Sequence, residues 1–231
     1  MVMNYFSDFI SLVFPRICAG CGNSLWKKEV VLCNFCEFHL PKTSFHHDLE
    51  NPVTNLFLGR VNIIAGAAFL YFNKGGKVQR LVHQLKYKDR KDIGIHLGEL
   101  YGQTLKYAPQ FNSADVIIPV PLHKKKYMQR GYNQSEQIAI GLATAMKIPV
   151  NRHLLTRTKA TETQTRKSRF SRYQNVKEIF SVASPQEWSG KHLVLVDDVI
   201  TTGATLESCI QALATIPGAR ISVACIATAM I

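Results

Sequence analysis

The chain lacks any apolar run long enough to cross a membrane. A spanning helix needs roughly 20 consecutive apolar residues, whereas the longest apolar run, residues 63–72, is about half that length and contains Gly66. The N-terminal stretch MVMNYFSDFISLVF has no basic start, and Asp8 interrupts it, so it is a poor signal peptide. We therefore expect a cytoplasmic protein without membrane insertion, whose N-terminus forms an amphipathic docking helix.

Internal repeats and low-complexity linkers are also absent. Neither the Gly-x₄-Gly-Lys-Ser/Thr motif of P-loop proteins nor the Rossmann glycine fingerprint occurs. The 231 residues are 46% hydrophobic, which suffices for one domain, or for one domain and a small module.

Acidic residues are scarce. The chain has 16 Asp and Glu against 28 Lys and Arg, a net charge of +12. Residues 115–180 alone hold 13 of the basic and 4 of the acidic residues. This balance suits polyanionic partners such as phosphates, pyrophosphate or nucleic acid. Charge alone is equally compatible with a solvated basic surface.

Composition changes once, near residues 40–55, from a cysteine-rich segment to alternating strand and helix patterns. The expected strands are 63–72, 116–120, 192–196 and 221–227, and the expected helices are 77–87, 92–107, 134–147 and 204–214. This alternation predicts an α/β fold with a mostly parallel sheet flanked by helices. We predict a module over residues 1–50 and the α/β domain over 51–231. Ligands of such sheets bind beyond the carboxyl ends of the strands, here after Val120 and Val196.

The segment 193–205 carries the strongest chemical signal. A buried strand leads to two carboxylates, Asp197 and Asp198, and then to a polar turn and a helix that include Thr201, Thr202, Gly203, Ala204 and Thr205. The helix start and the hydroxyl groups suit a phosphate. The carboxylates suit ribose hydroxyls or hydrated Mg²⁺. An isolated Asp-Asp pair would more simply end a strand before a capped helix, but the four features in register favour a ligand site.

The spacing Cys18-x₂-Cys21-x₁₁-Cys33-x₂-Cys36 predicts a structural Zn²⁺ site in a small zinc-ribbon or knuckle module. Disulfides are the competing interpretation, but the chain shows no export signal. Cys209 and Cys225 are expected to be small buried residues. We expect His46 and His47 to be solvated, and His123 to cap a helix or to be exposed.

These motifs resemble the type I phosphoribosyltransferases, which bind phosphoribosyl pyrophosphate (PRPP). Segment 193–205 resembles their PRPP signature, and Ile117-Ile118-Pro119-Val120-Pro121, followed by Lys124–Lys126 and 130–136, resembles their pyrophosphate loop. Together with Phe14-Pro15 and the cysteines, the chain is most similar to the ComF branch, the competence-associated proteins of this fold. Segment 157–180 resembles that branch's flexible loop, except that Glu178 and Ile179 replace an expected small residue before Phe180.

The resemblance implies a binding site for PRPP with Mg²⁺. Asp197 and Asp198 would hold the ribose, and residues 201–205 would hold the 5-phosphate. Val120 and Pro121 would bind the ligand as part of the pyrophosphate loop. Catalytic roles would fall to Asp197, Asp198, Lys124, Arg130 and Arg166, the last in a cationic lid that closes over the polyanion.

The sequence is compatible with two functions. One is transfer of 5-phosphoribosyl to an unidentified acceptor with release of pyrophosphate. The other, also implied by the ComF resemblance, is handling of single-stranded DNA in transformation or DNA utilisation, together with a DNA-uptake helicase or a recombination mediator. Tyr127, Phe170 and Tyr173 lie among the cations and could stack on bases.

Overall fold

The computed structural model describes residues 15–158 and 179–229. At its centre is a four-stranded sheet in the order β1-β6-β5-β2, in which every neighbouring pair is parallel. Its strands are β1 (Ala65–Tyr71), β2 (Val116–Pro119), β5 (His192–Ile200) and β6 (Arg220–Thr228). Parallel neighbours require crossover connections, so the alternation of strands and helices expected from the sequence is confirmed.

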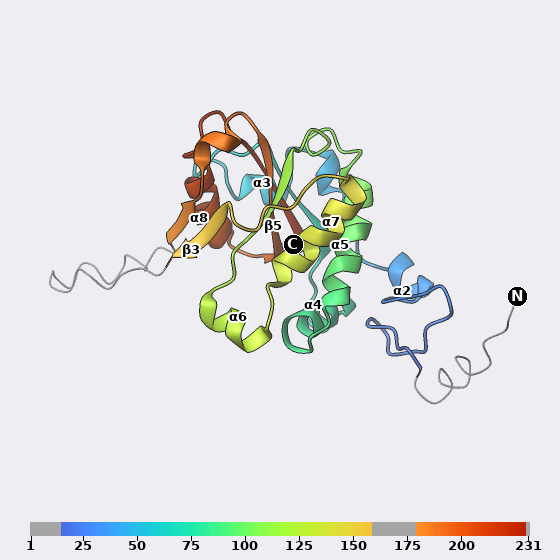
Figure 1. Ribbon diagram of the computed structural model, residues 1–231. Helices are drawn as coiled ribbons and strands as arrows, with labels where there is room; N and C mark the ends of the chain where they lie inside the picture. Colours follow the sequence, from blue (N-terminus) through green and yellow to red (C-terminus); the bar gives the residue numbers. More distant parts are fainter. Residues whose placement is uncertain (1–14, 159–178, 230–231) are drawn as a thin grey trace, which may run out of the picture.

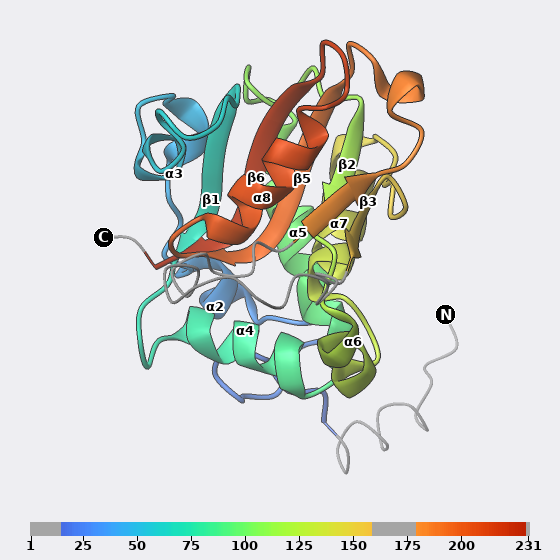
Figure 2. The ribbon, with the colours of Figure 1, turned by 90° about the vertical axis from the view of Figure 1, so that its left-hand side faces the viewer.

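Helices cover both faces of the sheet (Figures 1 and 2). One face carries α5 (Lys91–Leu105) and α7 (Gln134–Met146), and the other carries α8 (Ala204–Leu213) and the short α3 (Pro52–Asn55). Strand residues alternate between these layers: Ile117 and Val194 join the core under α5 and α7, whereas Ile118 and Leu195 join the core under α8. The predicted α/β class is confirmed. None of the helices among the described residues has the length and apolarity that a membrane crossing requires.

Glycines let α5 and α7 approach closely. A Cβ atom on Gly141 would lie 2.0 Å from the carbonyl oxygen of Ile95, and one on Gly98 would lie 2.3 Å from that of Ile138. No larger residue fits at either position without moving a helix. Because α7 also packs on β2 and β5, this contact sets where the first turn of α7 lies relative to the sheet.

Two further helices lie beyond the carboxyl ends of the strands, α4 (Lys77–Tyr87) after β1 and α6 (Lys124–Arg130) after β2 (Figure 2). The bounds of α4 match the prediction. The family resemblance assigned the basic segment of α6 to the pyrophosphate loop, and no helix was predicted there. Local signals delimit it nonetheless: His123 Nδ1 accepts a hydrogen bond from the Lys125 N–H (3.1 Å), and Gly131, with φ 76°, ends it.

β5 is longer than predicted. Its pairing with β6 continues past Val196 through Asp197↔Cys225 and Val199↔Ala227. The two carboxylates therefore lie inside the strand, and the turn to α8 begins after Ile200. The prediction ended too early because the unbroken apolar run stops at Val196, whereas backbone pairing does not depend on side-chain polarity.

A small antiparallel sheet, β3 (Leu155–Thr158) paired with β4 (Ile179–Val182), was not predicted. It flanks the segment in which the sequence indicated a cationic lid. Residues 159–178, with Arg166, Phe170 and Tyr173, lie outside the described residues. The short η3 (Pro185–Trp188) leads from β4 toward β5.

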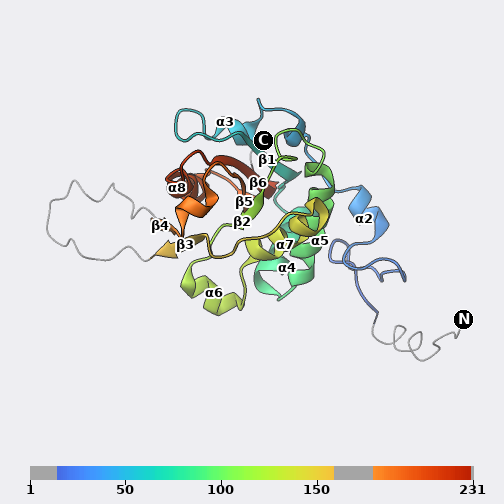
Figure 3. The same cartoon turned by 45° about the horizontal axis from the view of Figure 1, so that its top comes forward.

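The cysteine-rich segment, with α2 (Asn34–Phe38), lies beside α4 and α5, on the side of the molecule away from α8 (Figure 3). Gln84 Nε2 donates to the Ala19 carbonyl and Arg80 Nη1 to the Gly20 carbonyl, both at 2.8 Å. The module boundary near residue 50 remains a prediction.

The expected solvation of the His46–His47 pair is wrong for His46. It lies in η1 (Phe45–His47) and is buried. η1 follows Thr43, which bonds through its backbone N–H to the Phe69 carbonyl of β1. Burial lowers the pKa of His46. His46 is buried by tertiary packing, and the local sequence does not indicate which of two adjacent histidines faces the interior.

Candidate functional site

The turn from β5 to α8 forms a small open cradle. Gly203 precedes α8 with φ 73°, a conformation that favours glycine, and no side chain caps the helix. Its first N–H groups therefore have no side-chain acceptor. A cavity of about 80 Å³ opens here, lined by Asp197 and residues 199–206. The helix start and the hydroxyls of Thr201, Thr202 and Thr205 make the cradle suited to a phosphate dianion.

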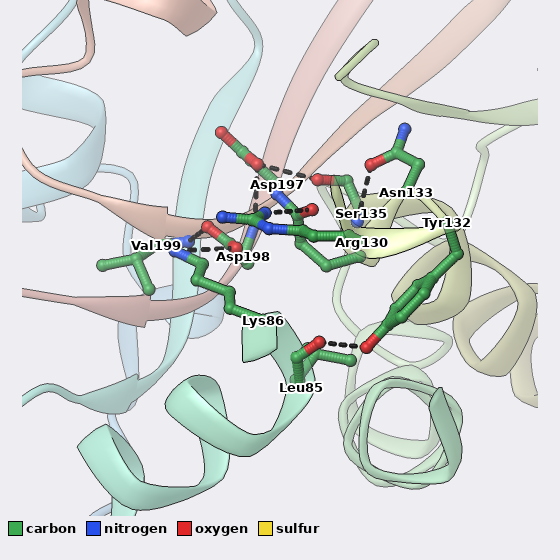
Figure 4. Close-up of polar contacts among 10 residues, drawn as sticks. Leu85, Lys86, Arg130, Tyr132, Asn133, Ser135, Asp197, Asp198 and Val199 are labelled. Carbon is green, nitrogen blue, oxygen red and sulfur yellow. Dashed lines mark hydrogen bonds and ion pairs between the residues drawn. The ribbon is translucent and has the colours of Figure 1, made fainter. Parts of the chain in front are cut away.

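Asp197 and Asp198 are held differently (Figure 4). Asp197 Oδ1 accepts hydrogen bonds from Ser135 Oγ and from the backbone N–H of Asp198, both at 2.8 Å. Asp198 is only 4% exposed, and its Oδ1 accepts from the Val199 N–H (2.7 Å). Its Oδ2 accepts no hydrogen bond from the described residues and instead lies 2.9 Å from Lys86 Nζ as an ion pair. A ligand that reaches this oxygen would share it with the Lys86 ammonium group.

Electrostatics at the pair favour a bound cation or donor. Burial and, after it, the neighbouring Asp198 carboxylate raise the pKa of Asp197 to about 7, although the Ser135 hydroxyl and the Asp198 N–H oppose the rise. A divalent cation or ribose hydroxyl groups would relieve this repulsion. The donor set fits hydrated Mg²⁺, which prefers one or two carboxylates and retains several waters.

A second cavity of about 170 Å³ lies on the other side of the carboxylates, between β2, α6 and the start of α7. Its cationic wall consists of Lys86 from α4, Lys126 and Arg130 from α6 and Arg157 from β3. Val120 and Pro121 also line it, together with Leu122, Gln134, Ser135, Asp197, Asp198 and Thr205. A polyanion placed here would touch both the cations and the carboxylate pair.

Capping interactions position this wall. Asn133 caps α7 by accepting from the Ser135 N–H (3.1 Å), and its Nδ2 donates to the Val120 carbonyl (2.9 Å) at the end of β2. Arg130 Nη1 donates to Gln134 Oε1 (2.7 Å), and both side chains line the second cavity. The strand end, the cap and the basic helix are therefore linked as one unit.

The structure brings together most of the residues predicted for the site. Arg130 and all the predicted ligand-binding positions line one or both cavities: Val120, Pro121, Asp197, Asp198, Thr201, Thr202, Gly203, Ala204 and Thr205. Lys124 lines neither of them; it is the first residue of α6, and helical geometry directs Lys126 to the cavity instead. Arg166 is not among the described residues.

Lys86, Gln134 and Ser135 were missed as site residues. Gln134 and Ser135 fall within the loop motif 130–136, so they could have been singled out from it. Lys86 offered no such signal, because it reaches the site from a helix that follows the distant β1.

The four N-terminal cysteines form a cluster that could hold a metal ion. Their Sγ atoms all lie within 4.8 Å of one another, and those of Cys21 and Cys33 are 3.8 Å apart. Tetrahedral Zn–S bonds of about 2.3 Å imply a similar S···S spacing, about 3.8 Å. The N–H of Cys33 donates to Cys18 Sγ (3.2 Å) and that of Cys36 to Cys33 Sγ (3.4 Å). None of the six cysteines forms a disulfide, and Cys209 and Cys225 are buried as expected.

The comparisons agree with this geometry. The family described as "Phosphoribosyl transferase domain" matches residues 83–231. "DNA utilization protein YhgH" of Escherichia coli (strain K12) is 34% identical over 149 residues, which cover 63% of this chain and 65% of the relative. "Competence protein F" of Haemophilus influenzae is 36% identical over 130 residues, 54% of this chain and 57% of the relative. The chain thus spans slightly less than two thirds of these curated relatives.

Solved structures show weaker likeness. The Bacillus subtilis glutamine PRPP amidotransferase complexed with ADP and GMP is 23% identical, with a TM-score of 0.39, over 61% of this chain and 30% of that one. The purine phosphoribosyltransferase of Pyrococcus horikoshii is 20% identical, with a TM-score of 0.37, over 60% of this chain and 73% of that one. The family match covers most of the chain and contains both cavities, and with the named relatives it identifies the chain as a member of the phosphoribosyl transferase domain family, in its ComF branch.

Proposed function

We propose that this chain binds PRPP with Mg²⁺ across the two cavities and serves a process of DNA uptake or DNA utilisation. The observation that carries the proposal is the order of three features along one edge of the sheet: an open helix start, a pair of adjacent carboxylates and a cationic wall. A ribose that carries a phosphate at one end and a pyrophosphate at the other needs the same order.

The 5-phosphate would bind the backbone N–H groups at the start of α8 and the hydroxyl groups of Thr201, Thr202 and Thr205. Gly203 supplies the left-handed backbone of this turn, and a Cβ atom there would lie 3.3 Å from the Phe57 ring. The ribose hydroxyls would donate to Asp197 and to Asp198 Oδ2, which would keep Lys86 as its ionic partner.

The pyrophosphate would lie against Lys86, Lys126, Arg130 and Arg157. When the anomeric carbon loses its bond to pyrophosphate, negative charge grows on the leaving oxygens. Cations held in place by Gln134 and by the Asp198 ion pair stabilise that charge without rearranging. Mg²⁺, when bound, would supply further stabilisation of the same oxygens. Transfer of 5-phosphoribosyl to an acceptor is the reaction this arrangement supports.

A role in DNA utilisation is supported by the names of the relatives. Direct binding of single-stranded DNA is the second candidate function. The feature that favours it is α6, where Tyr127 is half exposed beside Lys124, Lys125 and Lys126. Cations next to an aromatic ring provide phosphate contacts and a stacking surface together.

We also propose that the four-cysteine cluster holds a structural Zn²⁺. Four thiolates close the coordination shell and leave no position for a substrate. The segment that carries them has few core residues of its own and contacts α4 through Ala19 and Gly20. Metal ligation would therefore stabilise the surface against which the end of α4, and with it Lys86, is placed.

Thermal unfolding of the full chain with Mg²⁺ tests PRPP binding. PRPP well above its Kd should raise the Tm by roughly 5–10 °C. Ribose 5-phosphate, pyrophosphate or free bases should give smaller shifts. Asp198→Asn should abolish the PRPP shift, whereas Asp48→Asn, an exposed carboxylate near η1, should keep it. Equal stabilisation by pyrophosphate alone would contradict the proposal.

Two further assays separate the candidate functions. Release of pyrophosphate from PRPP across a panel of bases and amines would identify an enzyme, and Asp198→Asn should eliminate it. Salt-dependent binding of single-stranded DNA that persists in Asp198→Asn and weakens when Lys124, Lys125 and Lys126 are replaced by Gln would support the DNA-binding alternative.

A further inference from the structure

A third cavity, of about 310 Å³, lies between the end of α4 and α6, next to the cationic wall. It is larger than either cavity beside the carboxylates and within the usual range for small-molecule pockets. We call it the tyrosine pocket. Tyr87, Asp89, Gln129 and Tyr132 line it, and Lys86, Lys126 and Arg130 line both it and the pyrophosphate cavity.

The tyrosine pocket offers a flat stacking surface. Tyr87 is 63% exposed, and the guanidinium of Arg130 lies over its ring, 5.3 Å from the centroid. Tyr132 is buried and fixed by a hydrogen bond from its hydroxyl to the Leu85 carbonyl (Figure 4). Unpaired nucleobases stack on both tyrosine rings and arginine planes, so a base can extend the stack of Tyr87 and Arg130.

Asp89 adds a directional acceptor at the rim. It follows the end of α4 with φ 52°, a left-handed conformation that few residues other than glycine, asparagine and aspartate adopt. Its side chain is 74% exposed, and one carboxylate oxygen lies 3.3 Å from Lys91 Nζ. A carboxylate accepts from the exocyclic amino groups of adenine and cytosine, which thymine lacks.

The charged residues of the pocket also fit a ligand that carries a phosphate. Lys86 and Lys126, which also line the pyrophosphate cavity, supply positive charge in the same pocket as the stack of Tyr87 and Arg130. A phosphate attached to a planar base can contact the lysines and the stack together. An apolar ligand would make no polar contact with the cations or Asp89, and an isolated phosphate would leave the Tyr87 ring uncovered.

We propose that the tyrosine pocket binds one unpaired nucleotide, with its phosphate on Lys86, Lys126 and Arg130, its base stacked on Tyr87 and a base amino group on Asp89. The nucleotide is either free or part of a single strand. This proposal goes beyond PRPP binding and does not depend on it, although the shared cations imply that PRPP and the nucleotide compete.

Calorimetric titration of the full chain without PRPP tests the proposal, with dAMP, dCMP, dTMP and short dA and dT oligonucleotides as probes. Tyr87→Ala should weaken binding by about tenfold or more, because a stacked base is lost, and Tyr87→Phe should retain it. The matched control is Tyr107→Ala, since Tyr107 is 76% exposed and carries Lys106 over its ring at 4.8 Å, away from the pocket.

Asp89→Asn tests the preference for particular bases, which a purely structural role of Asp89 would not affect. Asparagine tolerates the left-handed backbone but presents both a donor and an acceptor, so the preference for dAMP and dCMP over dTMP should shrink or reverse. Binding of mononucleotides identifies free nucleotides as the source, and binding of oligonucleotides alone identifies a strand. Binding that Tyr87→Ala lowers no more than Tyr107→Ala does would overturn the proposal, as would the absence of binding. If PRPP still raises the Tm of Tyr87→Ala, PRPP binding does not depend on the nucleotide site, and the two proposals can fail independently.

Discussion

Lys86 Nζ lies 2.9 Å from Asp198 Oδ2, which ties the last turn of α4 to a strand more than a hundred residues later. The ammonium group is the cationic partner of a nearly buried carboxylate, and it also belongs to the wall of the proposed pyrophosphate site. One side chain therefore links the stability of the fold with the affinity of the site for a polyanion.

Lys86→Met should lower the free energy of unfolding by about 1–3 kcal/mol at neutral pH, because Asp198 is left buried without its cation. Urea denaturation would measure this, with Lys88→Met, the exposed lysine that follows α4, as the control. The double variant Lys86→Met/Asp198→Asn should recover part of the loss. No recovery would mean that the ion pair is not the cause.

The pH dependence of stability should report Asp197. Folding raises the pKa of its carboxyl from 3.8 to about 7, so its contribution is fully present below pH 3.8 and is lost as the pH rises through 7. Asp197→Asn cannot ionise. The free energy of unfolding of this variant minus that of the unmodified chain should therefore be about 1–3 kcal/mol larger at pH 8 than at pH 4.

Asp115→Asn is the control of opposite sign in the same denaturation series. A hydrogen bond from the His192 N–H, helped by Lys191, lowers the pKa of Asp115. Its stabilising contribution is present above the unfolded pKa and lost as the pH falls through the folded value. Asp115→Asn should therefore be the less stable protein at pH 8. Parallel profiles for the two variants would contradict both assignments.

Gly203→Ala should cost about 1–2 kcal/mol of stability and weaken binding of phosphate-bearing ligands at the start of α8. The cause is its φ of 73° together with the Phe57 ring, 3.3 Å from the added Cβ. Gly75→Ala isolates the backbone cost, since Gly75 has φ 79° and no atoms near an added Cβ. Denaturation should show a smaller loss of stability for Gly75→Ala than for Gly203→Ala, and PRPP titration should show a binding defect only for Gly203→Ala.

Metal content should follow the cysteine cluster. Elemental analysis is expected to find one Zn²⁺ per chain, and Cys36→Ser should reduce that content and lower the Tm. Cys209→Ala, which changes a buried cysteine of α8 outside the cluster, should keep the metal. A strong chelator should reproduce the Cys36→Ser effect on the unmodified chain. Unchanged metal content in Cys36→Ser would contradict the assignment.

Local sequence patterns were sufficient to predict several parts of this protein. The apolar runs before Val120 and Val196 located the neighbouring strands β2 and β5, because buried parallel strands are continuously apolar. The periodic apolar residues of segment 77–87 predicted α4 to its exact bounds. The cysteine spacing predicted the cluster, because two Cys-x₂-Cys turns already hold their thiols in pairs.

Tertiary structure decided the rest, because it depends on residues far apart in the chain. Pairing with β6 extended β5 past Asp197, so the carboxylates lie within the sheet. Lys86 comes from a helix beyond β1, and no local pattern connects it with Asp198. α6 was hidden by its basic composition, yet its helical turn directs Lys126 and Arg130, rather than Lys124, toward the ligand cavities. Which residues meet there follows from how the layers pack.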